Sequence, residues 1–562
     1  MAEATSAPQR LPEERLDRMK KSINDICKIS GVAGASIRVV FQGEALFTHG
    51  YGFSDIEKQS PTSPDTIYGI GSITKSIIAA SLSLLVEEGK LNWDTRVCDL
   101  LPDFRHDDPV ITQLLTITDI LSHRSGLAGG GGMSLSFQGD GEMLLAENKL
   151  YHVVNHLPIL FPIRQGWDYF VWGYALAGEI IQKVSGKSLE SFVRERLLQH
   201  LDMNDTSFKL GRFDPQRLAE PYAALQDGTP HHLQHRQQFE DTFFEASGGL
   251  FSSTADVMKW AMATLDAIDG SGAKVLSGMP NMISSHAAIL NPSLRERSYG
   301  LGWVRTQLPG VVGVVGDNIG LWNMEDQPVL GQKNKPIFML YHQGSTVGYY
   351  SHIALFPETK SAVVVLTNSI ALSDAPDWIS RAIIQTLFEL EDGNDYVQLA
   401  AQANSKQIAE YDTLASGIAL RRKPFIANQV PPIESFVGKY TNKSGLCCIE
   451  ILPTASGEAT TLELRFQGHA LQSYQLRYLC DTTFEWSLSH DESKKRGRYN
   501  ITSLDYFLFK FKVSGGKPVS FTWVFDPSLP DHPEEFVVHG APRMSPLARV
   551  CSMMPKLRLP WR

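Results

Sequence analysis

The feature that most constrains this chain is a continuous apolar segment that carries a lysine close to its start. In "YGIGSITKSIIAASLSLLVEEGKL", residues 68–91, the apolar and small residues after Ser72 are spread all round a 3.6-residue period. This pattern predicts a helix with no face in water. Lys75 lies in its first turn, where desolvation disfavours an ammonium group and lowers its pKa. The fold must therefore bury this helix and accommodate its lysine.

The size and charge of the chain set the frame for that helix. With 562 residues the chain is too long for one core, which predicts two domains. Hydrophobic residues make up 43% and charged residues 20%, which is enough apolar material for a large core. The net charge of −9 argues against a nucleic-acid partner.

Targeting and metal signals are weak throughout the sequence. Residues 1–30 carry charge without an apolar core region, and no run of about 18 apolar residues predicts a membrane span. No clustered His, Asp or Glu spacing indicates a metal, so we expect neither a metal nor a cofactor. A reduced, cytoplasmic protein is expected, because the cysteines form no disulfide framework or C-x-x-C pattern: Cys27, Cys98, Cys447, Cys448, Cys480 and Cys551.

The first part of the chain reads as a mixed α/β domain. Residues 32–70 alternate apolar and polar side chains around a glycine turn, which predicts a strand hairpin. "YALAGEIIQKVSGKSLESFVRERLLQHL" is amphipathic with helical period and is broken at Gly186, and "YYSHIALFPETKSAVVVLTNS" predicts two strands around a turn. We place a helical lead-in at residues 1–29 and this domain at 30–395.

The second part of the chain has a different pattern of apolar and polar residues. Residues 396–432 are predicted to form a helical connector that ends at two prolines. Short alternating runs separated by Gly, Asn and Ser turns then fill residues 433–541, a pattern typical of an antiparallel β-barrel. The basic, proline-broken residues 542–562 read as a surface tail.

Ser72 and Lys75 are three residues apart, so a helix would place the hydroxyl and the amine side by side at its N-terminus. A neutral, desolvated lysine can accept the serine proton, which makes the serine a nucleophile. Two further Ser-x-x-Lys strings, Ser271–Lys274 and Ser514–Lys517, lie in glycine-containing turns, so only the first opens an apolar helix. The simpler alternative is a capping serine followed by a lysine that extends to the surface.

Several further segments make the chain resemble the serine β-lactamase and penicillin-binding-protein superfamily, whose nucleophile motif is Ser-x-x-Lys. They occur in the family's order between residues 30 and 370, and the class C-type esterase branch is the most similar. The resemblance implies a β-lactamase/transpeptidase-like domain with a central antiparallel sheet and a helical subdomain, followed by a lipocalin-like barrel. The segments are "ITDILSHRSGL", "FPIRQGWDYFVWGYALAGEIIQKVSG", "ASGGLFSSTADVMKW", "YGLGW" and "HQGSTVGYYSHIALFPETKSAVVVLTNS".

The resemblance also implies roles for individual residues. Ser72 becomes the nucleophile and Lys75 its proton partner, while Tyr169 takes the place of the second-motif tyrosine, as a general base or a proton shuttle. His342 begins the third motif, which continues through Gln343 to Gly344. The backbone N–H groups of Ser72 and Ser345 would form the oxyanion hole. The alternative for Tyr169 is a core aromatic, and for His342 a satisfied strand residue.

Two departures from the family pattern bear on the substrate. Val171 replaces the second-motif asparagine, and Ile163 and Arg164 replace a Pro-Gly, so efficient hydrolysis of β-lactams or D-alanyl peptides is not expected. The apolar side chain of Val171 cannot form a hydrogen bond with a substrate amide or with Lys75. A large aromatic pocket is expected instead, formed by Trp167, Phe170, Trp172 and Trp322.

Three functions remain open on sequence alone. The first is an esterase-like serine hydrolase acting on a bulky hydrophobic ester, lactone or amide of a small molecule. The second is an acyltransferase or cyclase of secondary metabolism that uses the same machinery. The third is a scaffold that has lost acylation and binds a ligand or promotes a different reaction. The barrel is expected to be a packing appendage, and the oligomeric state cannot be read.

Overall fold

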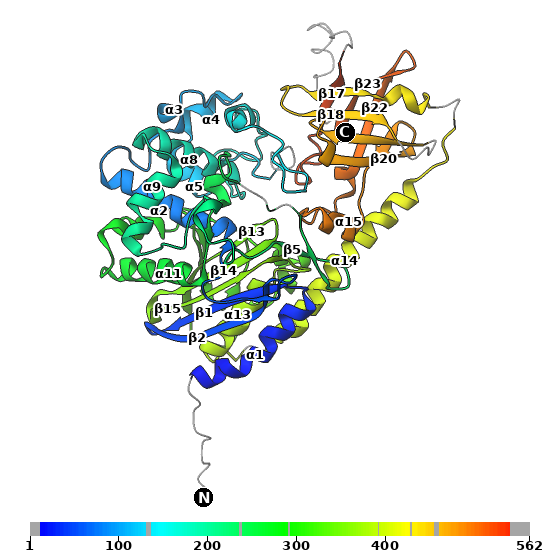
Figure 1. The fold of residues 1–562 in the computed structure, drawn as a ribbon. Helices are drawn as coiled ribbons and strands as arrows, with labels where there is room; N and C mark the ends of the chain where they lie inside the picture. Colours follow the sequence, from blue (N-terminus) through cyan, green and yellow to red (C-terminus); the bar gives the residue numbers. More distant parts are fainter. Residues whose placement is uncertain are drawn as a thin grey trace, which may run out of the picture. The chain divides into compact units, whose positions relative to one another are not determined.

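A computed structural model describes residues 12–130, 136–234, 236, 239–289, 293–391, 393–426, 430–454 and 460–539 (Figure 1). The predicted tail at 542–562 and the first eleven residues of the lead-in lie outside these ranges. The described residues divide into two compact units. The first runs to Ala419 and includes Ser487–Tyr506 and Phe525–Leu529, and the second contains Leu420–Trp486, Phe507–Val524 and the residues from Pro530.

The first unit is built on an antiparallel sheet of nine described strands, which confirms the predicted central sheet. Their order is β3-β2-β1-β15-β14-β13-β10-β9-β8. Neighbours in the chain pair as hairpins, for example β13 with β14. The strands are β1 Gly34–Phe41, β2 Glu44–Asp55, β3 Ser60–Pro61, β8 Ala287–Ala288, β9 Arg297–Tyr299, β10 Val304–Leu308, β13 Ile337–Thr346, β14 Tyr349–Phe356 and β15 Ser361–Thr367.

Helices cover both faces of this sheet. Helix α1, Pro12–Ile29, and helix α13, Ala375–Leu387, share one hydrophobic core with Val363 and Val365 of β15. Helix α11, Thr254–Asp269, contacts β1 and β15. Because successive residues of a strand face opposite sides, the equally buried Val364 and Leu366 face away from α1 and α13. Burial on both faces explains why β15 reads as a continuous apolar run rather than an alternating one.

The apolar segment after Ser72 forms the buried helix that the sequence predicts. Helix α2 spans Thr74–Glu87, and every residue from Thr74 to Leu85 is buried. It packs against α8, Val171–Ser185, which is also largely buried. Gly186 ends α8 with a φ of 69°, and α9, Leu189–Arg196, follows, as the break in the amphipathic pattern predicts. These helices form the predicted helical subdomain beside the sheet.

A long helix and the barrel form the later part of the chain. Helix α14 spans Tyr396–Arg421. In the second unit a closed barrel of eight described strands confirms the predicted antiparallel barrel. Rings that contact one another pack inside it, among them Phe466, Trp486 and Trp523, all fully buried. Its strands are β17 Gly438–Asn442, β18 Cys448–Pro453, β19 Thr461–Phe466, β20 Ser473–Cys480, β21 Thr483–Glu485, β22 Leu508–Ser514, β23 Lys517–Trp523 and β24 Glu534–Val538.

No helix in the described ranges is both long enough and apolar enough to cross a bilayer.

Candidate active site

Ser72 and Lys75 lie side by side at the start of the buried helix. Ser72 belongs to a single 3₁₀ turn, Gly71–Ile73, and α2 begins directly after it. The Lys75 Nζ atom lies 2.9 Å from Ser72 Oγ, and the lysine is 1% exposed while the serine is partly exposed. A substrate carbonyl can therefore approach the hydroxyl while the amine stays out of water.

The electrostatics of Lys75 suit proton transfer. Burial lowers the pKa of Lys75 from 10.5 to about 7, because the ammonium form loses its hydration inside the protein. The amine faces aromatic rings and polar atoms: Nζ lies 5.1 Å from the ring centre of Tyr169 and 5.3 Å from that of Tyr174. A substantial neutral fraction therefore exists near pH 7, and a neutral amine can accept the serine proton.

A backbone carbonyl of helix α10, Glu245–Gly248, also holds Lys75 in place. Lys75 Nζ donates to the Ser247 carbonyl oxygen at 2.6 Å. The Ser247 hydroxyl in turn donates to the Val171 carbonyl at 2.8 Å, which ties α10 to the start of α8. The apolar side chain of Val171 cannot hold Lys75, as the sequence indicates. The backbone carbonyl of Val171 instead anchors Ser247, whose own carbonyl accepts the hydrogen bond from Lys75. The amine thus keeps a fixed direction without the asparagine of the family pattern.

Tyr169 lies beside Ser72 and Lys75. Its hydroxyl is buried and meets no hydrogen-bond geometry within the described residues. Desolvation is the main cause and raises the pKa of Tyr169 above its usual value, while the nearby Ser72 hydroxyl acts in the opposite sense. The phenol therefore keeps its proton at neutral pH. Of the two roles implied for this tyrosine, shuttling a proton to a leaving group fits this protonated state better than acting as a resting base.

His342 on β13 is buried and neutral. Its Nδ1 atom lies 2.6 Å from the Gln343 carbonyl oxygen, which can only accept a hydrogen bond, so Nδ1 carries the proton. The Tyr299 hydroxyl, 2.9 Å away, then donates to Nε2. Burial is the main cause that lowers the pKa of His342 to about 3, and Lys75 adds to it. A permanent positive charge is thus absent from this position.

The proposed oxyanion donors lie where the 3₁₀ turn meets β13. A Cβ atom on Gly71 would lie 2.6 Å from the Ser345 amide nitrogen, and one on Gly344 would lie 3.0 Å from the Ser72 amide nitrogen. Only glycine permits this approach of the two backbones, and Gly71 also has a φ of +50°. The structure therefore brings the amides of Ser72 and Ser345 to the same place.

The four aromatic residues predicted to line a pocket separate into different environments. Trp167 is partly exposed and its ring lies 6.2 Å from that of Tyr169. Phe170 and Trp172 are fully buried, and Trp172 packs against Phe243 and Phe244 in the helical subdomain. Trp322 packs against Trp378 of α13 rather than on the rings around Lys75. Of these four residues, Trp167 is the one whose ring contacts Tyr169 beside Ser72.

Four residues near the site were not singled out from the sequence: His123, Tyr174, Ser247 and Tyr299. The His123 ring lies 4.4 Å from Tyr169 and 4.5 Å from Tyr299, centre to centre. These residues lie inside the segments "SHRSGL", "WGYAL", "ASGGL" and "YGLGW", so the only signal for them was the family-like context. We call the rings that gather here the aromatic cluster; its members are His123, Trp167, Tyr169, Tyr174, Tyr299 and His342.

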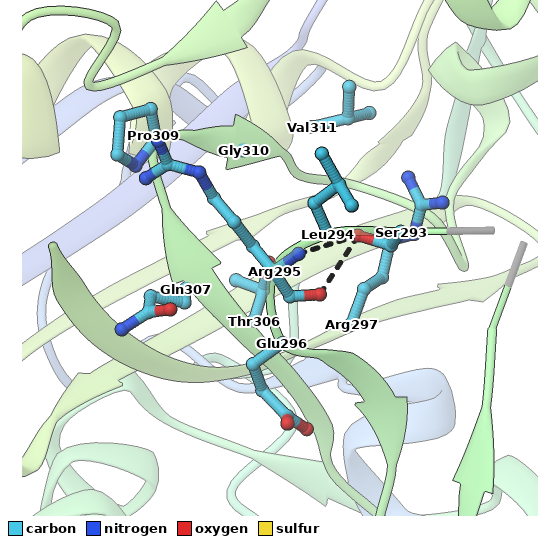
Figure 2. A pocket seen from close by; sticks show the side chains of 10 residues that line it. All are labelled: Ser293, Leu294, Arg295, Glu296, Arg297, Thr306, Gln307, Pro309, Gly310 and Val311. Carbon is cyan, nitrogen blue, oxygen red and sulfur yellow. Dashed lines mark hydrogen bonds between the residues drawn. The ribbon is translucent and has the colours of Figure 1, made fainter. Parts of the chain in front are cut away.

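A separate pocket of about 270 Å³ lies at the far end of the β9–β10 hairpin (Figure 2). Its lining is formed by Ser293–Arg297, Thr306, Gln307 and Pro309–Val311, and includes none of the predicted site residues. Within the described part of the chain, no three His, Cys, Asp or Glu side chains come together as a metal site.

Several known proteins are similar to this chain. A family model described as Beta-lactamase matches residues 19–385. The chain is 26% identical over 379 residues to the unguisins hydrolase ungD of Aspergillus violaceofuscus, an alignment that covers 62% of this chain and 60% of the relative. It is 26% identical over 337 residues to protein flp of Staphylococcus aureus, with 60% of each chain covered. The matched region thus spans about three fifths of these relatives.

A solved structure resembles this chain over most of its length. The octameric penicillin-binding protein homologue from Pyrococcus abyssi superposes with a TM-score of 0.55 at 20% identity, over 93% of this chain and 99% of that one. At this identity the match shows the fold.

Proposed function

Because the chain belongs to the beta-lactamase family, we propose that it is a serine hydrolase that forms a covalent acyl-enzyme on Ser72. The observation that carries the proposal is the buried Lys75 amine, 2.9 Å from the Ser72 oxygen and with a pKa of about 7. The similar Aspergillus protein is named as a hydrolase, which supports hydrolysis as the reaction of this chain.

The reaction would proceed in two steps. Ser72 Oγ attacks the substrate carbonyl carbon while its proton moves to neutral Lys75 Nζ, and the oxyanion forms beside the amides of Ser72 and Ser345. Collapse of this intermediate breaks the bond to the leaving group, which takes a proton through the Tyr169 hydroxyl. Tyr169 is then reprotonated from Lys75, which leaves the amine neutral. A water molecule attacks the acyl-enzyme by the same route, releasing the acid and restoring Ser72.

The substrate we propose is a hydrophobic ester, lactone or amide of a small molecule. Trp167 supports this choice because it is partly exposed at the edge of the aromatic cluster. A neutral His342 also favours an uncharged group on the acyl side, since no fixed positive charge at this position attracts a carboxylate. An acyltransferase would use the same first step and differ only in the acceptor that resolves the acyl-enzyme.

A panel of p-nitrophenyl esters of increasing acyl size tests the proposal. We expect turnover of the larger esters, a mass increase equal to one acyl group on intact protein, and loss of both in Ser72→Ala. Added primary alcohols report on transfer: an ester product identifies an acyltransferase, and free acid alone identifies a hydrolase. Turnover that is unchanged by Ser72→Ala would refute the proposed function.

A further inference from the structure

Tyr169 lies in a stretch of chain that no regular element holds. Helix α8 begins at Val171, and Phe170, which precedes it, has a φ of −94° and a ψ of 86°. The position of the phenol therefore depends on how the backbone on either side of Tyr169 is fixed. A general acid that is misplaced by about 1 Å loses on the order of 100-fold in rate, so this fixation matters for any chemistry at Ser72.

His123 makes hydrogen bonds on both sides of Tyr169. The Asp168 N–H donates to the His123 carbonyl oxygen at 3.1 Å. The Phe170 N–H donates to the Nδ1 atom of the His123 ring at 2.9 Å. The ring itself packs 4.4 Å from the ring of Tyr169, centre to centre. One residue thus holds the peptide units before and after the tyrosine and contacts the phenol between them.

We propose that His123 is the positioning residue that sets Tyr169 against Ser72, and that it does so as the neutral tautomer protonated on Nε2. The tautomer follows from the geometry, because a nitrogen that accepts the Phe170 N–H cannot carry a proton. The proposal deepens the proposed function and rests on it, since the tyrosine matters only if Ser72 is acylated.

The surroundings of His123 keep the ring neutral. The residue is completely buried, and burial is the main cause that holds its pKa well below the usual value. Lys75 and His342 lower the pKa of His123 further whenever they carry a positive charge, because like charges repel. Protonation of Nδ1 would also break the hydrogen bond from the Phe170 N–H, so the geometry favours the neutral ring as well.

The backbone of His123 is strained in a way that fits a positioning role. Its φ of 61° lies in the left-handed region, which residues other than glycine adopt rarely and at a cost in free energy. Neighbouring hydrogen bonds hold this conformation: Arg124 accepts from the Arg164 N–H through its carbonyl at 2.9 Å, and Gly126 accepts from the Leu160 N–H at 2.8 Å. The segment that departs from the family pattern at Ile163 and Arg164 is thus bound to the segment that carries His123.

Three substitutions separate positioning from general stability. In His123→Asn the amide oxygen can occupy the place of Nδ1, in His123→Gln it reaches the place of Nε2, and His123→Ala removes both. With an alkyl ester whose alcohol is a poor leaving group, we expect His123→Ala to lower kcat by about 10- to 100-fold with little change in KM. His123→Asn should recover most of this loss, and His123→Gln should not.

The Tyr169→Phe background supplies the decisive comparison. If His123 acts through the tyrosine, His123→Ala should cost less than about threefold in kcat once the hydroxyl is gone, because the two effects are not additive. The same loss in both backgrounds, or equal activity of His123→Asn and His123→Gln, would overturn the proposal. Thermal unfolding of each variant identifies any that fail to fold.

A measurement without turnover separates this proposal from the proposed function. Ring ¹⁵N NMR of the histidine-labelled protein, assigned by difference with His123→Asn, reports the tautomer directly. We expect the Nε2–H form with an accepting Nδ1, and an Nδ1–H form or an imidazolium at pH 7 would overturn the proposal. Failure of Ser72→Ala to affect turnover would instead refute the acyl-enzyme while leaving this tautomer in place.

Discussion

At the scale of single residues, the account depends on the state of one amine. Lys75 has a pKa of about 7 in the folded chain and an ordinary value of 10.5. Between these two values the unfolded chain binds the proton and the folded chain does not, so stability rises with pH across this window. A lysine of this kind weakens the fold near neutral pH, which is a cost that a purely structural residue would not carry.

Lys75→Met tests this cost. The variant lacks the titrating group, so its melting temperature relative to the wild type should be highest near pH 7 and should fall as the pH is raised towards 10. The measurement is thermal unfolding of both proteins over that range. A difference that stays constant with pH would show that Lys75 keeps an ordinary pKa.

Tyr169 can be tested through the leaving group. Tyr169→Phe removes the proton that is proposed to reach the departing oxygen, so kcat for an alkyl ester should fall by about 10²- to 10⁴-fold. A p-nitrophenyl ester needs no such help and should lose much less. Equal losses for both esters would contradict the shuttle role.

At the scale of elements, the site forms where a 3₁₀ turn, the helices α2, α8 and α10, and strand β13 meet. The sequence predicts α2 and the closeness of Ser72 and Lys75 well, because apolar periodicity and the three-residue spacing are local signals, although the 3₁₀ turn that carries Ser72 was not predicted. It could not predict that Ser247 would hold Lys75 from 172 residues away, since the string "ASGGL" has no chemistry of its own. The sequence also could not show where the rings of Trp172 and Trp322 pack, because composition contains no information about the direction of a side chain.

The 3₁₀ turn and β13 approach each other so closely at Gly71 that a methyl group there should disrupt the site. Gly71→Ala forces a Cβ within 2.6 Å of the Ser345 amide nitrogen, so it should abolish acylation and destabilise the fold. Gly89→Ala has a similar φ of +68° but open space around it, and should cost only about 1–2 kcal/mol and leave acylation intact. Acylation is measured by intact mass, and an active Gly71→Ala variant would contradict the proposed oxyanion site.

At the scale of the whole molecule, the two units do not follow the order of the chain. The alternating pattern predicts the barrel strands, yet residues 487–506, which lie between barrel strands in sequence, group with the first unit. Strand periodicity describes the faces of a sheet and contains no information about where a long connection packs. Arg498 shows the packing: it is 4% exposed and its Nη1 atom donates to the Gln138 carbonyl at 2.7 Å.

Arg498→Ala tests whether this segment stabilises the first unit. Loss of its buried hydrogen bonds should lower the free energy of unfolding by about 2–4 kcal/mol. Arg465→Ala is the control, because this arginine pairs with Glu463 on the partly exposed surface of the barrel and should change stability by less than about 1 kcal/mol. Urea denaturation gives both values, and equal effects would contradict a structural role for the segment.

The central claim is that neutral Lys75 turns Ser72 into a nucleophile. The most direct test is the rate of labelling by a fluorophosphonate as a function of pH, followed by intact mass. We predict a single label on Ser72, a rate that rises through a midpoint near pH 7, and labelling about 10²- to 10⁴-fold slower in Lys75→Met. A rate that does not change with pH, or one that Lys75→Met leaves intact, would contradict the claim.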